Sequence, residues 1–291
     1  MKVFLSWYAS PPDPPYWLWV RSLDGIVVAL HSLRRGVLDS AIVRGLKRSL
    51  GCGKTLVVDS LPFSLYSGAR GFAEPLQSWV LYVQRMLGAD ILIHRDYPLV
   101  KASEGERERL LKRTILNAEH ALKVAEKLGV NVMLVVQGWD IESYTRCAEH
   151  YKSLGAKYIG IGSLAPKKGN VEFLESVIKA IREVLSQNTY VHLFGVSSPR
   201  LALKLAKYVD SIDISTPIRA AVAREVIVEI SGKLKRVHIS AVGEEQLHKM
   251  LETVSLDLLE KFKNAKRLRD AVRAIAVYNA YVLINWLKKS T

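Results

Sequence analysis

A strand–helix–strand unit in the second half of the chain restricts the possible folds more than any other feature. It is the segment YVHLFGVSSPRLALKLAKYVDSIDISTPIR, residues 190–219. Its two apolar runs, residues 191–196 and 211–216, are short, β-rich and bounded by Gly, Ser or Pro, as buried strands are. Between them, Pro199 suits a first helical turn and several leucines supply an apolar face. Two strands joined by such a crossover helix run parallel.

The same alternation extends over most of the chain. Six further apolar runs stand near Gly, Pro or Asp, at residues 3–8, 26–30, 56–59, 91–94, 132–136 and 158–161. Helical spacing of apolar residues is found between most of them, at residues 38–50, 79–87, 104–128, 142–154 and 171–185. Eight parallel strands alternating with helices close into a (β/α)8 barrel, the TIM-barrel member of the α/β class. We expect this barrel over about residues 1–219, within a single domain of 291 residues.

The pattern changes after Arg219. Residues 226–230 and 236–240, joined by Ser231, Gly232 and Lys233, predict a β-hairpin appended to the barrel. Two helices are expected after it, at residues 244–262 and 265–288, and they carry many Lys and Arg between their apolar positions. We expect the part from about 220 to 291 to close the barrel on its outside.

The charge balance points to a polyanionic partner. The chain has 42 Lys and Arg against 28 Asp and Glu, a net charge of +14. The positive residues are spread over many predicted helices and are not collected on one amphipathic segment, which favours a phosphate backbone over a membrane surface. The alternative is a basic, soluble protein without such a partner.

Neither a membrane anchor nor a metal site is expected. No apolar run approaches the length of a spanning helix, and the N-terminal residues lack the long apolar core of a signal peptide. Cys52 and Cys147 fall in different predicted elements, without a CxxC pair or a His at ligand spacing. They form neither a zinc motif nor a disulfide framework, which indicates a cytoplasmic protein.

Candidate functional residues lie where the predicted strands end, because the active site of such a barrel is at the carboxyl ends of its strands. They are Asp59, Asp96, Gln137 with Gly138, Gly162 with Ser163, Phe194 with Gly195, and Asp213. This set fits a pocket for a flat polar ligand. Asp213 lies within a buried strand, where a carboxylate loses solvation unless it is paired or used; a side chain turned to the solvated strand end is the alternative. Phe63 and Phe194 could stack on a nucleobase, or could pack in the core.

Six segments of the sequence give further evidence on the fold and the function. They are VVDSLPFSLYSG (57–68), ADILIHRDYP (89–98), VVQGW (135–139), YIGIGSLA (158–165), HLFGVSSP (192–199) and VDSIDISTPIR (209–219). In order and context they resemble the DSGGxQ, SDIxxxFDE, VQGG, YAIGGLA, HxMGVGTP and VDxFDxVxPTR motifs of the tRNA-guanine transglycosylase family, and the segment around Tyr278 and Asn279 is also similar. That family has a (β/α)8 barrel, in agreement with the pattern of strands and helices.

The resemblance implies a role for each candidate. Asp213 is implied as the nucleophile that attacks the anomeric carbon and displaces guanine, and Asp59 as the general acid/base that manages protons on the departing and entering bases. Asp96 and Gln137 match residues that bind the guanine edge, with Gly138, Gly162 and the backbone around Ser163 completing the pocket. Phe63 and Phe194 stand where the family has a stacking Tyr and a Met. The target base must leave its stack to reach such a pocket.

Several positions depart from the family pattern. The glycine pair after the first Asp is replaced by Leu61 and Pro62, the following Gln by Ser64, and one pocket Gly by Ser163. The family's zinc motif of three Cys and one His is absent, and the expected hairpin takes its place in the chain, so no cofactor is expected. The segment at residues 137–151 is closer to relatives that insert 7-deazaguanines into DNA, which leaves both tRNA and DNA open as substrates.

Two functions remain in view. The first is exchange of a guanine in a polynucleotide for a 7-deazaguanine-type base; the second is a non-catalytic nucleic-acid-binding paralogue, or the partner subunit of a transglycosylase. A homodimer or a heteromeric complex is compatible with either. Basic residues outside the pocket are candidates for phosphate contacts, namely Lys167, Lys168, Arg200, Arg219, Arg224, Lys233, Lys235 and Arg236. The alternative for these residues is a solvated basic face.

Overall fold

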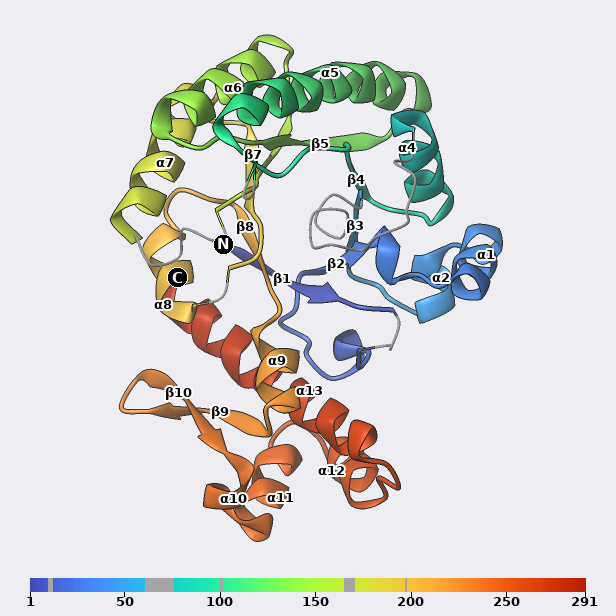
Figure 1. The fold of residues 1–291 in the computed structure, drawn as a ribbon. Coiled ribbons are helices and arrows are strands. Elements are labelled where there is room, and N and C mark those ends of the chain that lie inside the picture. The colour runs from blue at the N-terminus through green and yellow to red at the C-terminus, as the bar shows by residue number, and fades with distance from the viewer. Residues whose placement is uncertain (10–12, 61–75, 100–101, 165–170, 197) are drawn as a thin grey trace.

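The expected (β/α)8 barrel is confirmed by a computed structural model, which describes residues 1–291 except 10–12, 61–75, 100–101, 165–170 and 197 (Figure 1). Eight strands form a closed parallel barrel in chain order. They are β1 Lys2–Trp7, β2 Gly25–Ala29, β3 Thr55–Asp59, β4 Ile91–Ile93, β5 Asn131–Val136, β6 Tyr158–Ile161, β7 Tyr190–Leu193 and β8 Ser211–Ile214. The first and last strands pair directly, with Phe4 opposite Asp213, and this pairing closes the barrel.

Helices surround the strands. Between β1 and β8 the chain forms the 3-10 turns η1 Tyr16–Leu18 and η2 Leu30–Ser32 and the helices α1 Arg35–Arg44, α2 Leu46–Leu50, α4 Gln77–Met86, α5 Glu104–Leu128, α6 Ile141–Ser153, α7 Val171–Val184 and α8 Pro199–Leu205. The helix expected at residues 38–50 is two helices, because Gly45 between them has a φ of 75°. Within the described residues, none of the helices combines the length and the apolar character needed to cross a bilayer.

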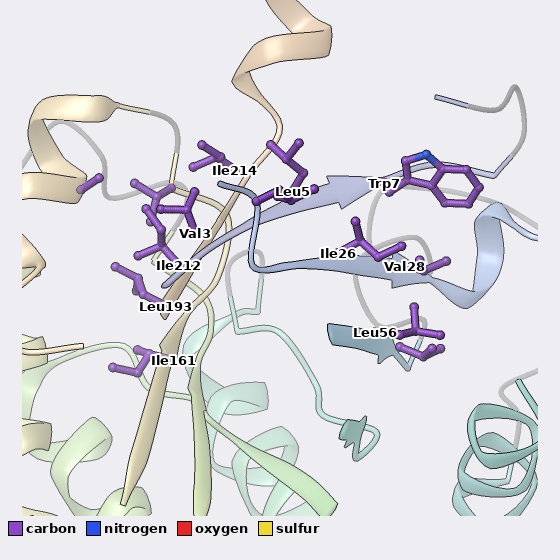
Figure 2. Packing of buried hydrophobic residues seen from close by; sticks show 14 of the residues in the cluster. Val3, Leu5, Trp7, Ile26, Val28, Leu56, Ile161, Leu193, Ile212 and Ile214 are labelled. Atoms are coloured by element: carbon purple, nitrogen blue, oxygen red, sulfur yellow. The ribbon is translucent and has the colours of Figure 1, made fainter. Parts of the chain in front are cut away.

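Alternation along the strands produces two apolar cores. Odd residues of β1, such as Val3, Leu5 and Trp7, point outward and join the large core beneath the helices (Figure 2). Phe4 points inward and packs with Val57 and other residues inside the barrel. The two-residue period of a strand therefore decides which side chains can reach the barrel interior, where the candidate site lies.

The end of β8 differs from the prediction. The strand stops at Ile214, two residues before the expected limit, and α9 Thr216–Val222 begins with Pro217 in its first turn. Proline supplies no backbone N–H for a strand ladder but fits the first turn of a helix, where that donor has no partner in any case.

The predicted hairpin is present as β9 Glu225–Ile230 and β10 Lys233–His238. Its turn is Ser231 and Gly232, whose φ values are 51° and 72°. Two successive positive φ values are typical of the tight turns that match the twist of a hairpin. The second strand therefore starts three residues earlier than expected, and residues 239–242 form α10 Ile239–Val242.

The C-terminal helices attach this part of the chain to the barrel. The helix expected at residues 244–262 is divided into α11 Glu244–Glu252 and α12 Leu256–Lys263, because the Ser255 hydroxyl accepts a hydrogen bond from the backbone of Leu258 and so caps a new helix. The last helix, α13 Leu268–Ser290, packs along α9, β9 and α8. Near the end of this helix, Asn285 Oδ1 accepts a hydrogen bond from the hydroxyl of Ser22, and Lys288 forms an ion pair with Asp24. Ser22 and Asp24 lie in the turn before β2. The last helix thus lies against the barrel wall, as Figure 1 also shows.

Candidate active site

A cavity of about 350 Å³ opens at the carboxyl ends of the barrel strands. The structure brings together most of the residues predicted for the pocket. Those lining the cavity are Asp59, Asp96, Gln137, Gly162, Ser163, Phe194, Gly195 and Asp213. Arg219, which was expected outside the pocket, lines the cavity as well. Their convergence follows from the parallel order of the strands, which places every carboxyl end at one mouth of the barrel.

Asp213 is held by donors on both carboxylate oxygens. Its side chain is 5% exposed. The backbone N–H of Gly195 donates to Oδ1 at 2.8 Å, and the hydroxyl of Ser6 donates to Oδ2. Burial alone would raise the pKa of this carboxyl, but contacts with His192, Ser6 and Gly195 outweigh burial, so the pKa of Asp213 is lowered. Asp213 is therefore a carboxylate, with its charge stabilised inside the barrel.

His192 is the third partner of Asp213. Its imidazole is fully buried, and Nε2 lies 3.3 Å from Asp213 Oδ1, without the alignment of a hydrogen bond. On the other side of the ring, Nδ1 and the hydroxyl of Ser211 are 2.7 Å apart. The ring also packs edge-on against Phe194, with centroids 4.6 Å apart. The imidazole is thus fixed in place with one nitrogen turned to the carboxylate.

Asp59, at the end of β3, has a raised pKa, in contrast to the lowered pKa of Asp213. Its pKa is raised to about 6: burial is the largest cause, the backbone N–H of Ser60 acts in the opposite direction, and the negative charge of Asp213 adds to the effect of burial. Within the described residues, the backbone N–H of Ser60, 2.7 Å from Oδ1, is the one hydrogen-bond donor to this carboxyl group. A carboxyl group with this pKa can exchange a proton near neutral pH.

Asp96 and Gln137 form a buried pair opposite Asp213. The amide Nε2 of Gln137 donates to Asp96 Oδ2. Burial, and then the charge of Asp59, raise the pKa of Asp96 to about 7 in spite of this bond. Gln137 Oε1 is buried and has no hydrogen-bond partner among the described residues. A buried polar atom in this state is suited to a donor on a bound ligand.

Small residues shape the wall beside this pair. A Cβ placed on Gly162 would lie 2.5 Å from Gln137 Nε2, so only glycine allows the amide to take its position. Ser163 has a φ of 57°, and its hydroxyl accepts a hydrogen bond from the backbone of Leu99 at 2.9 Å. The chain there has a backbone conformation that glycine favours, and it is joined to the loop after β4.

Gly138 does not line the cavity. A Cβ at this position would lie 2.7 Å from the ring of Tyr144, whose hydroxyl donates to the carbonyl of Gly162 at 2.9 Å. Gly138 therefore allows a close contact behind the wall of the cavity.

Of the two predicted stacking residues, Phe194 lies in the cavity wall. Its ring occupies the space over Gly160, where an added Cβ would lie 2.4 Å from Cε2. One edge is thus packed in the barrel interior and the rest faces the cavity. Phe63 lies outside the described residues, as do Lys167 and Lys168.

Several lining residues are not among those predicted from the sequence. Ser6, Trp7, Tyr8, Ala29 and His31 lie near the beginning of the chain, and Ser215 follows β8. Tyr8 OH and His31 Nε2 are 3.5 Å apart at the rim. Burial, followed by the charges of Asp59 and Asp13, raises the pKa of Tyr8, and burial lowers that of His31. The available signal was the end of the first two predicted strands, which reach the same mouth as the other six.

The predicted cationic residues separate into groups. Arg219 lines the cavity and also a neighbouring groove, and Lys235 and Arg236 line that groove alone. Arg200, Arg224 and Lys233 are exposed and line neither of the two.

The described residues do not fit a zinc ion of the kind that the family motif binds. Among them, no three His, Cys, Asp or Glu side chains are arranged to hold a metal. Cys52 and Cys147 are both buried, and the hairpin β9–β10 contains no cysteine. The donor set that a structural zinc site requires is missing from this part of the chain.

A comparison with protein-family models matches residues 32–262 to the family described as queuine tRNA-ribosyltransferase. The matched range contains all three cavity carboxylates and the hairpin, and it leaves out β1 and β2. A comparison with curated proteins gives no match.

Proposed function

The chain belongs to the queuine tRNA-ribosyltransferase family, and from this membership we propose a reaction in which Asp213 exchanges one base of a polynucleotide for another. The family implies a tRNA-guanine transglycosylase-type function, that of a transferase acting on nucleic-acid bases. The proposed reaction replaces a guanine by a 7-deazaguanine-type base through a covalent bond between Asp213 and the sugar.

The observation that carries this proposal is the opposite shift of two carboxyl pKa values in one cavity. Asp213 has a lowered pKa, whereas that of Asp59 is raised to about 6. A nucleophile must be ionised, and a proton donor must hold its proton near the working pH. Two acids with environments that separate their pKa values are typical of such a division of roles.

The proposed exchange has two steps, the displacement of guanine by Asp213 and the displacement of Asp213 by the entering base. The carboxylate of Asp213 forms a bond to the anomeric carbon while the glycosidic C–N bond breaks, and the electron pair leaves with guanine. Asp59 gives its proton to the departing base. The entering base then returns a proton to Asp59 as its ring nitrogen attacks the anomeric carbon and releases Asp213.

Asp96 and Gln137 supply a polar edge for the base. The unpartnered Gln137 Oε1 accepts from a base donor, and Asp96 changes from donor to acceptor as it ionises near its pKa of about 7. Phe194, at the end of β7, offers an apolar ring to the same cavity, and Gly162 leaves the space that the Gln137 amide needs. No metal takes part in this scheme.

The alternative proposal is a nucleic-acid-binding paralogue or partner subunit without catalysis. What favours the active enzyme is that the nucleophile candidate is held by three side-chain and backbone partners, an arrangement that binding alone does not need.

Incubation with labelled guanine separates the two proposals. Purified protein is given tRNA or duplex DNA, and label in the polymer is measured, with unlabelled 7-deazaguanines as competitors. We expect incorporation into one polymer and its suppression by a 7-deazaguanine. Binding of both polymers with no incorporation into either would support the non-catalytic alternative.

A further inference from the structure

A second groove adjoins the catalytic cavity on the side of the hairpin. It has a volume of about 410 Å³ and is bounded by the start of α8, by α9, by both hairpin strands and by α13. Arg219 lines both the groove and the cavity, so the two spaces meet at this side chain. A ligand that entered the cavity could extend past Arg219 into the groove.

The groove is positively charged, and among the described residues no carboxylate lines it. Its cations are Arg219, Lys235 and Arg236. Arg236 lies 3.3 Å from Glu225, which offsets its charge. Arg219 and Lys235 are exposed, and neither has an ion-pair partner among the described residues. Within the described part of the chain, their charges are therefore not offset by a neighbouring carboxylate, unlike that of Lys249, which pairs with Glu245.

The lining of the groove combines apolar side chains with hydroxyl groups. Ile227, Leu234 and Leu283 are apolar, and Ser198 and Thr216 contribute hydroxyls. Positive charges beside such a mixed lining suit a ligand that combines an anion with a less polar body. A nucleotide has that composition, with a phosphate attached to a sugar and a base.

A buried asparagine holds the hairpin in position relative to α9. Asn279 is fully buried in α13. Its Oδ1 accepts from the backbone of Ile227 at 2.7 Å, and its Nδ2 donates to the carbonyls of Glu225, at 3.0 Å, and Pro217, at 3.3 Å. These bonds join β9, which carries the groove residue Ile227, to α9, which carries Arg219. The groove is therefore organised before any ligand binds, which reduces the entropy lost on binding.

We propose that this groove binds the phosphate and sugar of a nucleotide next to the one whose base enters the catalytic cavity, with Arg219 and Lys235 on the phosphate. The inference rests on the proposed function, because it takes the ligand to be a polynucleotide with one base extruded. The proposal assigns different roles to two lysines of the hairpin. Lys235 contacts the sugar-phosphate backbone of the polynucleotide, whereas Lys233 is solvated.

The test compares Lys235→Gln with Lys233→Gln, which removes the same charge from an exposed position two residues away on the same strand. Binding of a fluorescent single-stranded oligonucleotide is measured between 50 and 200 mM salt, with RNA and DNA of one sequence as separate arms. Each phosphate contact contributes roughly 0.7 to 0.9 to the slope of log affinity against log salt. We expect Lys235→Gln to lower the slope by about that amount and Lys233→Gln to leave it unchanged. Equal losses in the two variants would overturn the proposal, and the arm that shows the split identifies the polymer.

A second measurement locates the phosphate. Oligonucleotides with one neutral methylphosphonate at each position in turn are bound by the parent and by Lys235→Gln. We expect a methylphosphonate at one position beside the target guanine to weaken binding by the parent. The same methylphosphonate should have little effect on Lys235→Gln, because the variant has already lost the charge pair between Lys235 and that phosphate. Methylphosphonate effects that are the same in the parent and the variant at every position would contradict the assignment. Neither measurement uses base exchange, so a failure of the catalytic proposal would be seen separately.

Discussion

One wall of the cavity at the barrel mouth, formed by the ends of β7, β8 and β1, surrounds a single carboxylate with donors, whereas the opposite wall, formed by the ends of β3, β4 and β5, carries two carboxyl groups. On the first wall, Ser6, Gly195 and His192 lower the pKa of Asp213. On the second wall, burial is the main cause that raises the pKa values of Asp59 and Asp96 to about 6 and about 7; the charge of Asp213 adds to the effect on Asp59, and the charge of Asp59 adds to the effect on Asp96. We call these the donor wall and the acid wall.

The difference shows that surroundings decide the chemistry of a carboxyl group more than burial alone. All three groups lie deep in the barrel, where desolvation disfavours the charged form. Only on the donor wall do hydrogen bonds compensate for that loss. The acid wall keeps protons available at neutral pH, and the donor wall keeps a negative charge available.

The largest expected effect comes from removing the charge on the donor wall. Asp213→Asn keeps the shape of the side chain but cannot form a bond to the sugar, so exchange of labelled guanine should fall by more than about 10⁴-fold. No adduct between protein and polynucleotide should appear on denaturing gels. Binding of the polynucleotide should persist and serves as the control for folding. A surviving adduct would assign the nucleophile to another residue.

On the acid wall, Asp59→Asn should reduce exchange by roughly 10²- to 10⁴-fold, the usual range for a general acid/base. The parent should lose kcat/KM for the polynucleotide as pH rises above about 6, because the proton that Asp59 gives to the departing base is then lost. The variant should show no such limb. Adduct formation with an activated substrate that needs no protonation is the control. An unchanged limb in Asp59→Asn would place the titrating group elsewhere.

Most of the fold was predictable because its signals are local. Short apolar runs and helical spacing identify each element, and eight parallel strands leave few ways to close. The errors were at boundaries. The strand ending at Ile214, the break at Gly45 and the hairpin turn at Ser231 and Gly232 depend on single residues whose backbone angles a pattern of apolar residues does not specify.

The site was only partly predictable, because acids are visible in a sequence and their partners are not. Asp59, Asp96 and Asp213 stand out as polar residues at strand ends. Ser6 is ordinary in sequence, and His192 opens a matched motif without an assigned role; the pairing of β1 with β8 and of β7 with β8 brings both to Asp213. Strand alternation offered one usable signal, since Ser6 follows Phe4 and His192 precedes Phe194 on the inward-facing side.

The donor wall can be weakened without removing its carboxylate. His192→Phe removes the imidazole whose Nε2 lies 3.3 Å from Asp213, and we expect kcat/KM to fall by roughly tenfold to a hundredfold, the usual cost of losing a polar partner of a buried charged group. The acidic limb of the pH profile should move to higher pH, because the pKa of Asp213 rises when this partner is lost. His192→Gln, which retains a donor, should restore part of both effects. A loss of activity without a shift of the limb would limit His192 to a packing role.

The smallest effect concerns stability, and it tests the acid wall without catalysis. The pKa of Asp96 is about 7 in the folded protein, against 3.8 for an ordinary Asp. Between about pH 4 and pH 7 the folded state holds a proton on Asp96 that the unfolded state has released, so its contribution to stability falls as pH rises through this range and stays low above it. Asp96→Asn carries no such proton. Its free energy of unfolding relative to the parent should therefore increase between pH 5 and pH 8, by on the order of 1–2 kcal/mol in urea titrations.

Asp213→Asn is the matched control, because the pKa of Asp213 shifts in the opposite direction on folding. Since the pKa of Asp213 is lowered on folding, its carboxylate contributes stability at neutral pH that is lost in acid, and its removal should not produce a gain at pH 8. Parallel pH dependence in the parent and Asp96→Asn would mean that the two walls do not differ in the way their surroundings indicate.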